Sequence, residues 1–459
     1  MFATPQRIHF IGIGGIGMSG IAEILLTLGY TVTGSDLKRT AVTDRLEMLG
    51  ATVHEGHRAE NAAGADVVVT SSAVSANNPE VLEAKAHKIP VILRGEMLAE
   101  LMRLKYGIAV AGMHGKTTTT SLIAAVLAAG ELDPTVVVGG RVEALGSNAR
   151  FGRSRYLVAE ADESDRSFLK LMPILAVVTN LDREHMDTYR DIDDVKEAFV
   201  EFMNKVPFYG AIVVCADDAL LGEVLPRVRR RVVTYGVDAQ ADCRIEMLPK
   251  TEECHARFLL HVKGEKLGPF DLHVPGMHNV LNASAAAAIG LQLQIPVAQI
   301  VEGVSSFRGV DRRFQQKGVV RGVAVVDDYG HHPTEVKATL RAARECGYGK
   351  VHVLFQPHRY TRTRDMMAEF AEAFGDADTL EVLDIYAASE QPIAGITAQT
   401  LVDAIAKSKS RPKVVEYANG FAEAAARLAK AAQDGDAVLT LGAGNVSQAA
   451  AAVMDALKR

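Results

Sequence analysis

The stretch 107–120, GIAVAGMHGKTTTT, combines an apolar strand, a glycine-rich turn and the first residues of a helix. Glycines let backbone N–H groups approach phosphate oxygens closely, and the helix N-terminus adds the positive end of its dipole. Lys116 can then reach the β- and γ-phosphates of a nucleotide, and the Thr117 hydroxyl can hold magnesium. The loop is two residues shorter than the common form, with Val110 in place of the first glycine. The flanking strand and helix nevertheless favour nucleotide binding over a plain turn.

Acidic and histidine side chains follow two later strands and are candidates for holding the metal of a bound nucleotide. Glu160 ends the predicted strand 156–159, and Asp162 and Glu163 follow it directly. A carboxylate at the carboxyl end of a neighbouring strand faces the phosphate crevice. His185 lies just past a later strand, at the same end of the sheet. A purely structural loop histidine is an equally good interpretation, because oxygen atoms are the usual ligands of magnesium.

Strand and helix signals alternate on both sides of the phosphate loop and continue along the chain. Short apolar runs separated by helical patterns are typical of parallel sheets with crossover helices. The pattern predicts an α/β protein of three domains: a Rossmann-like N-terminal domain (1–105), a central P-loop ATPase-like domain (106–312) and a Rossmann-like C-terminal domain (313–459). Residues 242–274 alternate apolar and polar side chains, which predicts a small antiparallel β appendage on the central domain.

A second glycine-rich turn, GIGGIG at 12–17, follows the first predicted strand and leads into a helix. It matches the G-x-G-x-x-G pattern, and Asp36 closes the second strand, where a dinucleotide domain keeps its ribose-binding acid. Three interpretations stay open: an NAD site, a tight strand–helix turn, or a site for the pyrophosphate of another nucleotide. The stronger phosphate loop, about a hundred residues later, argues that hydride transfer is not the main chemistry.

The composition is that of a globular protein, with 48% hydrophobic and 23% charged residues in a chain of 459. Lys and Arg total 50 against 56 Asp and Glu, a net charge of −6, which argues against a nucleic-acid partner. The four cysteines form no Cys-x-x-Cys pair, so neither a zinc site nor a disulfide framework is expected. Without a signal segment or a long apolar run, the chain is expected to be cytoplasmic, with no membrane insertion.

Seven stretches, taken together, resemble the Mur ligases of peptidoglycan synthesis. The similarity covers essentially the whole chain and keeps the motifs in their order. The stretches are GIGGIG at 12–17, GMHGKTTT at 112–119, EADES at 160–164, HNVLNA at 278–283, RRF at 312–314, DDYGHHPTE at 327–335 and QPHRYTRTR at 356–364.

The resemblance implies an ATP-dependent amide-bond ligase that joins L-alanine to the carboxylate of UDP-N-acetylmuramate through an acyl phosphate, with magnesium as cofactor. The first domain then binds the UDP of the sugar nucleotide, the second binds ATP, and the third carries the amino acid and closes over both. By this interpretation the N-terminal turn cradles the UDP phosphates, and Asp36 meets the uridine rather than NAD.

The resemblance also implies site residues. The implied catalytic residues are Lys116, Glu160, His185 and Arg313, and the implied magnesium ligands are Thr117, Glu160 and His185. ATP contacts are implied for Gly112, His114, Gly115, Lys116, Thr117, Thr118, Asn279, Asn282, Arg313 and Asp328. Sugar-nucleotide contacts are implied for Gly14, Gly15, Ile16, Gly17, Met18, Ser19, Asp36, Ser71, Ser72 and Arg94, and L-alanine contacts for Tyr329, His331, His358, Arg359 and Arg362.

For some of these residues a purely structural role is the alternative interpretation. Asn279 would serve equally well as a helix cap. The basic residues from Arg359 to Arg364 could form an exposed helix start, but a positive cluster there opposes the helix dipole unless it binds an anion such as an amino-acid carboxylate.

Three other functions compete with this one. A recycling ligase of the same family would join the same sugar nucleotide to a whole peptide, but the Tyr329-Gly330 pair favours L-alanine. An NAD-dependent oxidoreductase leaves Lys116 and Glu160 unexplained. A nucleotide-binding regulator without catalysis is disfavoured by the complete set of metal, phosphate and amino-acid positions. The sequence leaves open whether the chain forms a homodimer.

Overall fold

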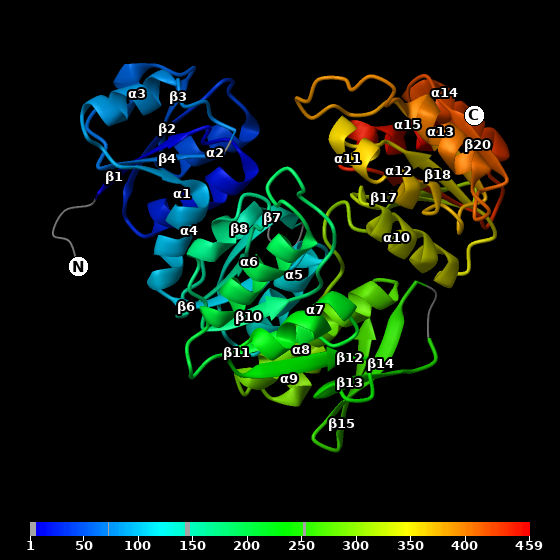
Figure 1. Cartoon of the computed structure of the whole chain (residues 1–459), viewed down its shortest axis with the longest axis horizontal. Coiled ribbons are helices and arrows are strands. Elements are labelled where there is room, and N and C mark those ends of the chain that lie inside the picture. The colour runs from blue at the N-terminus through cyan, green and yellow to red at the C-terminus, as the bar shows by residue number, and fades with distance from the viewer. Residues whose placement is uncertain (1–5, 72, 143–146, 251–253) are drawn as a thin grey trace. The chain divides into compact units, whose positions relative to one another are not determined.

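The computed structural model describes residues 6–71, 73–142, 147–250 and 254–459 (Figure 1). Within these ranges the strands form three sheets, of five, ten and six strands, which confirms the predicted α/β fold. The chain divides into two compact units. The first comprises Met1–Glu246, Leu259–Phe270 and Leu281–Ser306, and the second comprises Met247–Phe258, Asp271–Val280 and Phe307–Arg459.

The first sheet is parallel throughout, with strand order β3-β2-β1-β4-β5. Its strands read as apolar runs because helices cover both faces of a parallel sheet, and Phe10, Ile11 and Val68 are fully buried. The strand order reverses between β1 and β4, so the loops after these two strands border a crevice at the carboxyl edge. Its elements are β1 (Arg7–Ile11), α1 (Ile16–Thr27), β2 (Thr31–Asp36), α2 (Ala41–Met48), β3 (Thr52–Glu55), η1 (Ala59–Ala62), β4 (Val67–Thr70), α3 (Pro79–Ala86), β5 (Val91–Leu93) and α4 (Arg94–Arg103).

Among the elements of this first sheet, Glu80 in α3 has a fully buried carboxylate. Its oxygens accept hydrogen bonds from Ser35 Oγ at 2.6 Å and from Asn61 Nδ2 at 2.6 Å. His9 Nε2 lies 3.7 Å away. Burial raises the pKa of Glu80, but the attraction of His9 and the hydrogen bonds of Ser35 and Asn61 outweigh it and bring the pKa from 4.5 to about 2.

This pKa predicts a loss of stability in acid. The folded state holds Glu80 ionised below the pH at which the unfolded chain takes up a proton, so stability is lost as the pH falls from about 4.5 to about 2. The contribution of this group is about 3 kcal/mol. Denaturant unfolding at several pH values, with Glu80→Gln beside the wild type, measures it. A constant difference between the two proteins from neutral pH down to about pH 2 would contradict the prediction.

The second sheet places the phosphate loop at its centre, with strand order β15-β14-β13-β12-β11-β10-β6-β9-β7-β8. Strand β6 lies between β9 and β10 and runs parallel to both, so the loop after β6 has the carboxyl ends of both neighbours beside it. Its strands are β6 (Tyr106–Ala111), β7 (Thr135–Val142), β8 (Ser147–Arg150), β9 (Tyr156–Glu160), β10 (Leu175–Val178), β11 (Ala211–Cys215), β12 (Val232–Gly236), β13 (Cys243–Met247), β14 (Ala256–Val262) and β15 (Glu265–Leu272). The helical elements that accompany them are α5 (Lys116–Ala129), η3 (Ser167–Lys170), α6 (Ile192–Asn204), α7 (Ala219–Val224), η4 (Leu225–Arg227), α8 (Met277–Gln292) and α9 (Val297–Ser306).

The first strand of the appendage predicted at 242–274 does not have the expected antiparallel pairing. Strand β13 pairs in parallel with β12, through Tyr235 with Cys243 and Gly236 with Arg244, and so extends the central sheet. Alternation of apolar and polar side chains does not distinguish parallel from antiparallel pairing, because successive side chains point to opposite faces in both.

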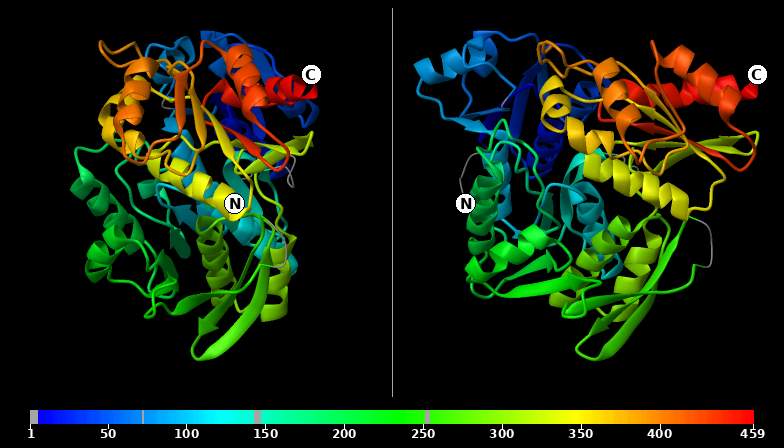
Figure 2. Two further views of the ribbon diagram at one scale, coloured as in Figure 1. Left: turned by 90° about the vertical axis from the view of Figure 1, so that its right-hand side faces the viewer. Right: turned by 45° about the vertical axis from the view of Figure 1, so that its right-hand side comes forward.

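The third sheet has strand order β16-β17-β21-β18-β19-β20. Strand β16 is antiparallel to β17, and the other pairs are parallel. Helices α10, α12 and α13 bury apolar side chains against one face, and α14 and α15 against the other. The strands and helices of this part of the chain are coloured from yellow to red in Figure 2. Its elements are β16 (Gln315–Val320), β17 (Val323–Asp328), α10 (Pro333–Glu345), β18 (Val351–Phe355), α11 (Tyr360–Asp365), α12 (Met367–Ala371), β19 (Thr379–Val382), α13 (Ala398–Lys407), β20 (Val414–Tyr417), α14 (Phe421–Ala431), β21 (Ala437–Leu441), η5 (Asn445–Gln448) and α15 (Ala449–Lys458). No helix in the described ranges is long and apolar enough to cross a membrane.

A disulfide joins Cys254 and Cys346 in the second unit, which the expectation of no disulfide framework did not anticipate. Cys346 follows α10, and the two residues are 92 positions apart in the sequence. Spacing alone could not reveal the pair, because the fold brings the two side chains together. Cys215 and Cys243 remain free and buried.

Reduction of this disulfide is expected to lower the free energy of unfolding of the second unit by up to about 4 kcal/mol, because the bond closes a long loop in the unfolded chain. Thermal unfolding with and without dithiothreitol measures the effect. The Cys346→Ser variant should melt at the lower temperature and should not respond to the reductant. Titration of the unreduced, denatured chain should find only the two thiols of Cys215 and Cys243; four thiols would contradict the pairing.

Candidate active site

The phosphate loop depends on two glycines with positive φ. Gly112 has φ 128° and Gly115, the N-cap of α5, has φ 82°. A Cβ at Gly112 would overlap the Thr179 side chain, and one at Gly115 would lie 2.6 Å from Asn282 Oδ1. Any other residue at either position would therefore be strained and would displace the loop.

The Lys116 side chain folds back over the phosphate loop. Its Nζ donates to Gly112 O at 2.7 Å, to Met113 O at 3.1 Å and to Glu163 Oε1 at 2.7 Å. Burial lowers the pKa of Lys116, but the charge and hydrogen bond of Glu163 outweigh it, and the pKa lies above its ordinary value. A cation is therefore held where a phosphate loop binds a triphosphate.

Glu163 links the lysine to the predicted metal-binding histidine. Its carboxylate is only 1% exposed, and its Oε1 also lies 3.3 Å from His185 Nε2. Burial lowers the pKa of His185, but Glu163 and Glu184 raise it above its ordinary value. Glu163 was one of the candidate carboxylates after strand β9, but it is not among the implied catalytic or metal-binding residues. The sequence signal that could have assigned a role to Glu163 was its position three residues after Glu160, at the end of the same strand.

A magnesium ion suits this group of residues. In the described part of the chain, Glu163 Oε2 is buried and accepts no hydrogen bond, which leaves an anionic oxygen for a cation. Glu160 ends β9 and occupies space that a Cβ at Gly139 would fill, with Oε2 2.7 Å from that position. The Thr117 hydroxyl in the first turn of α5 adds a neutral oxygen. Carboxylate and hydroxyl oxygens are the ligands that magnesium prefers.

Asn180 and Asp182, which sequence reasoning missed, clamp the loop at His114. Asn180 Oδ1 accepts from His114 N at 2.9 Å, and Asn180 Nδ2 donates to His114 O at 3.0 Å. Asp182 Oδ2 lies 2.9 Å from His114 Nε2. These two residues follow β10, so the parallel neighbour of β6 fixes the loop shape. The predicted ATP residues Thr118 and Asn282 are buried, and Thr119 Oγ1 donates to Asn282 Oδ1 at 3.0 Å.

The N-terminal glycine turn contacts the residues predicted around it. Gly14 N donates to Asp36 Oδ2 at 2.9 Å, and a Cβ at Gly17 would lie 2.9 Å from the Arg94 side chain. Arg94 Nη2 in turn donates to Asp162 Oδ2 at 2.7 Å. An ion pair therefore connects this turn to the acidic segment that follows β9.

Other predicted sugar-nucleotide residues lie along the same turn and helix. Gly15 is the N-cap of α1, which begins at Ile16, and the side chains of Met18 and Ser19 are buried within that helix. Ser71 follows β4 and is partly buried, whereas Ser72 lies outside the described residues.

In the second unit, the predicted ATP residue Arg313 and its neighbour Arg312 meet at Tyr329. The guanidinium carbons of Arg312 and Arg313 lie 4.9 Å and 5.1 Å from the centre of its ring. Arg313 Nη1 also lies 3.4 Å from Glu335 Oε1. Arg312 belongs to the RRF stretch but is not among the implied site residues. Its Nε lies 3.2 Å from Asp327 Oδ2.

Two predicted ATP residues of this unit are engaged locally. The Asp328 carboxylate accepts from Phe314 N and Gly330 N, both at 2.7 Å, and burial raises its pKa above the ordinary value. Asn279 Nδ2 donates to Pro275 O at 2.7 Å, so this side chain holds the start of α8.

The residues predicted to bind L-alanine form a continuous aromatic and basic group. The ring centre of His331 lies 5.3 Å from that of Tyr329 and 5.7 Å from that of His358. Arg362 Nη1 donates to His358 O at 3.0 Å. Arg359 precedes α11 with φ 71°. Tyr386, which the sequence did not suggest, stacks on His358 with ring centres 5.6 Å apart.

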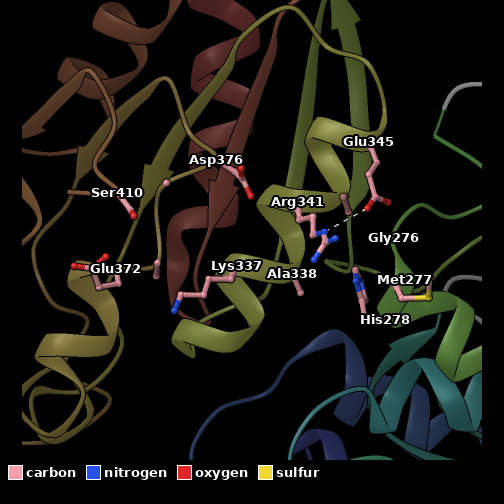
Figure 3. A pocket seen from close by; sticks show the side chains of 13 residues that line it. Gly276, Met277, His278, Lys337, Ala338, Arg341, Glu345, Glu372, Asp376 and Ser410 are labelled. Carbon is pink, nitrogen blue, oxygen red and sulfur yellow. Dashed lines mark ion pairs between the residues drawn. The ribbon is translucent and has the colours of Figure 1, made fainter. Parts of the chain in front are cut away.

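A cavity of about 440 Å³ lies elsewhere in the second unit (Figure 3). Lys337, Arg341 and Glu345 of α10 line one part of it, and Glu372 and Asp376 line another. Arg341 Nε lies 3.6 Å from Glu345 Oε1. None of the predicted site residues lines this cavity.

Three family models match successive parts of the chain. Residues 7–106 match the family model "Mur ligase family, catalytic domain", residues 110–290 match "Mur ligase middle domain", and residues 312–444 match "Mur ligase, glutamate ligase domain". The UDP-N-acetylmuramate–L-alanine ligase of Acidobacterium capsulatum is 66% identical over 458 residues, covering 100% of this chain and 99% of the relative. The enzyme of the same name from Koribacter versatilis is 63% identical over 462 residues, covering 100% of this chain and 98% of the relative.

Solved structures agree in fold. The UDP-N-acetylmuramate–alanine ligase of Thermotoga maritima superposes with a TM-score of 0.79 at 29% identity, covering 98% of this chain and 99% of the other. A murein peptide ligase of Psychrobacter arcticus gives a TM-score of 0.70 at 23% identity, with 99% of both chains covered. Three matched family models in the expected order, together with relatives above 60% identity along the full chain, establish that this protein belongs to the Mur ligase family.

Proposed function

We propose that this protein joins L-alanine to the carboxylate of UDP-N-acetylmuramate, with conversion of ATP to ADP and phosphate, in peptidoglycan precursor synthesis. The observation that carries the proposal is full-length identity of 66% and 63% to curated ligases of that name. The phosphate loop with its partly buried lysine supports it, because a nucleoside triphosphate must be held there for the reaction to begin.

A carboxylate is a poor acyl donor, so the reaction proceeds in two steps. The sugar carboxylate first attacks the γ-phosphate of ATP and forms an acyl phosphate, with ADP as the leaving group. The amine of L-alanine then attacks the acyl carbon, and phosphate leaves from the tetrahedral intermediate. Two anions must approach each other in the first step, so fixed positive charge at the γ-phosphate lowers its barrier.

Lys116 supplies that charge from the phosphate loop, where Glu163 keeps it protonated and in place. We assign Thr117, Glu160 and His185 as the residues that hold magnesium. A magnesium ion held by these residues would supply positive charge that offsets the negative charge of the phosphates. Backbone N–H groups from Gly112 to Thr118 surround the phosphates, and Asn279 and Asn282 contact the nucleotide from α8.

Residues of the second unit complete the proposed reaction. Arg313 reaches the γ-phosphate, and Asp328 positions the strand end that carries Tyr329 through its bonds to Phe314 N and Gly330 N. Tyr329, His331, His358, Arg359 and Arg362 form the L-alanine site. A guanidinium suits the amino-acid carboxylate because it donates two parallel hydrogen bonds.

The remaining assignments concern the sugar nucleotide and the organisation of the chain. Gly14 to Ser19, Asp36, Ser71, Ser72 and Arg94 contact the UDP sugar. The boundaries 1–105, 106–312 and 313–459 give one domain to each ligand, and the three separate sheets support this division. We place the enzyme in the cytoplasm, where ATP is available, and a homodimer is compatible with the assignments.

The first test is phosphate release with ATP, magnesium and UDP-N-acetylmuramate, with L-alanine or the tripeptide L-alanyl-γ-D-glutamyl-meso-diaminopimelate supplied in parallel. Turnover is expected with L-alanine, because the amine acceptor site is built around a single amino-acid carboxylate. Turnover with the tripeptide alone would assign the protein to the recycling branch and would make the L-alanine site wrong. Absence of turnover with both acceptors would contradict the ligase proposal itself.

A further inference from the structure

We propose that Glu80 is a positioning residue for the sugar-nucleotide site, where its buried carboxylate holds the ends of β2 and β3 and thereby aims the turn at 12–17 and Asp36 at the uridine nucleotide. The inference rests on the proposed function, because it takes the turn as the UDP site. Glu80 lies in α3 and is fully buried, so it touches no ligand itself.

One route from Glu80 to the turn passes through Ser35. Glu80 Oε2 accepts from Ser35 Oγ at 2.6 Å. The carbonyl oxygen of Ser35 accepts from Gly12 N at 2.8 Å and from Ile13 N at 3.0 Å. The residue whose side chain Glu80 holds is therefore the one that anchors the first two N–H groups of the turn.

A second route passes through Asn61 and Gly56, the residue after β3. Asn61 Nδ2 donates to Glu80 Oε1 at 2.6 Å and to Gly56 O at 3.1 Å. Gly56 N donates to Asp36 O at 2.7 Å, and Asp36 Oδ2 accepts from Gly14 N at 2.9 Å. Both routes meet at the end of β2, so one carboxylate holds that end from two sides.

Packing transmits this constraint to the turn. A Cβ at Gly34 would lie 2.6 Å from Ile13 Cδ1 and 2.8 Å from Phe10 O. The end of β2 and the turn therefore touch without spare space, and a shift of one moves the other.

The chemistry of the partners requires a carboxylate at this position. Ser35 Oγ and Asn61 Nδ2 both donate to Glu80, and His57 Nδ1 lies 3.2 Å from Glu80 Oε2. A carboxylate accepts from all three groups, whereas an amide would turn its own N–H₂ toward one of these donors. Glu80→Gln keeps the shape of the side chain and removes this match, which makes it the informative substitution.

The test compares Glu80→Gln and Ser35→Ala with the wild type. The matched control is Glu83→Gln on the same helix, where the carboxylate is 30% exposed and pairs with His87. The probe is UDP, with its Kd measured by calorimetry, followed by the KM for UDP-N-acetylmuramate. Both variants should raise these values about tenfold or more, with KM for ATP and kcat changed less than about twofold, because only the first site is displaced. Glu83→Gln should match the wild type.

Thermal unfolding separates positioning from folding. If the folded variants bind UDP as tightly as Glu83→Gln does, Glu80 is only a core acid and the proposal is overturned. If Glu80→Gln does not fold, Ser35→Ala decides by the same criterion, because it keeps the carboxylate and removes one route. A wild type that binds UDP but catalyses no ligation would count against the proposed reaction alone, since UDP affinity still decides the role of Glu80.

Discussion

Replacement of Lys116 by alanine is expected to lower kcat/KM for ATP by about a thousandfold. The ammonium donates to Gly112 O at 2.7 Å and so lies on the loop that receives the phosphates. Without the ammonium, the carboxylate of the sugar and the γ-phosphate approach each other with less compensation of their negative charge than in the wild type. The transition state is therefore less stabilised relative to the separated reactants. Steady-state phosphate release, with ATP varied at saturating UDP-N-acetylmuramate and L-alanine, measures the loss. Activity within about tenfold of the wild type would remove Lys116 from the mechanism.

Stability must be measured beside activity, because alanine at 116 leaves the Glu163 carboxylate buried without its cation. Removing one partner of a buried pair costs about 3–5 kcal/mol. The exposed pair Lys170–Glu96 is the matched control, since its N–O distance is also 2.7 Å. Lys170→Ala should cost less than about 1 kcal/mol and leave turnover unchanged. Lys116→Arg should not restore activity, because a planar guanidinium cannot take the place of an ammonium that donates to two nearby carbonyls.

Replacement of Glu163 by glutamine is expected to lower the free energy of unfolding by about 3 kcal/mol and turnover by about a hundredfold. The carboxylate is 1% exposed and faces both Lys116 Nζ at 2.7 Å and His185 Nε2 at 3.3 Å. A neutral amide leaves the partly buried ammonium without its counter-charge and removes the negative charge that faces the histidine ring. Urea unfolding and the phosphate-release assay measure the two effects separately.

A double variant distinguishes charge pairing from catalysis. Lys116→Met combined with Glu163→Gln removes both charges, so it should recover most of the stability that the single variants lose. Turnover should stay as low as in Lys116→Ala, because the cation is still absent. Glu96→Gln is the exposed control for the carboxylate. Recovery of turnover in the double variant, or an equal stability loss in Glu96→Gln, would contradict the roles given to this pair.

Local sequence determined much of this protein. The phosphate loop at 112–117 and the glycine turn at 12–17 were predicted because the conformations of glycine and the start of a helix depend on neighbours in the chain. Most strands of the parallel sheets were predicted as apolar runs, since burial on both faces leaves no other residue type acceptable. Helix α10 begins at Pro333, with Glu335 accepting from the backbone N–H groups of His331 and His332, three or four residues away in the sequence.

Contacts between distant segments were decided by the tertiary structure alone. Glu163 meets Lys116 across 47 positions, Arg94 meets Asp162 across 68, and Cys254 meets Cys346 across 92. The sequence shows that each of these side chains exists and to which strand end it belongs. Which partner it meets depends on strand order and on the space left by neighbouring residues, and the energy of a buried charge is set by that partner. The sequence therefore determined the reaction class and the elements that carry it, while the fold decided how Lys116 is held for the reaction and how Glu80 supports the turn at 12–17.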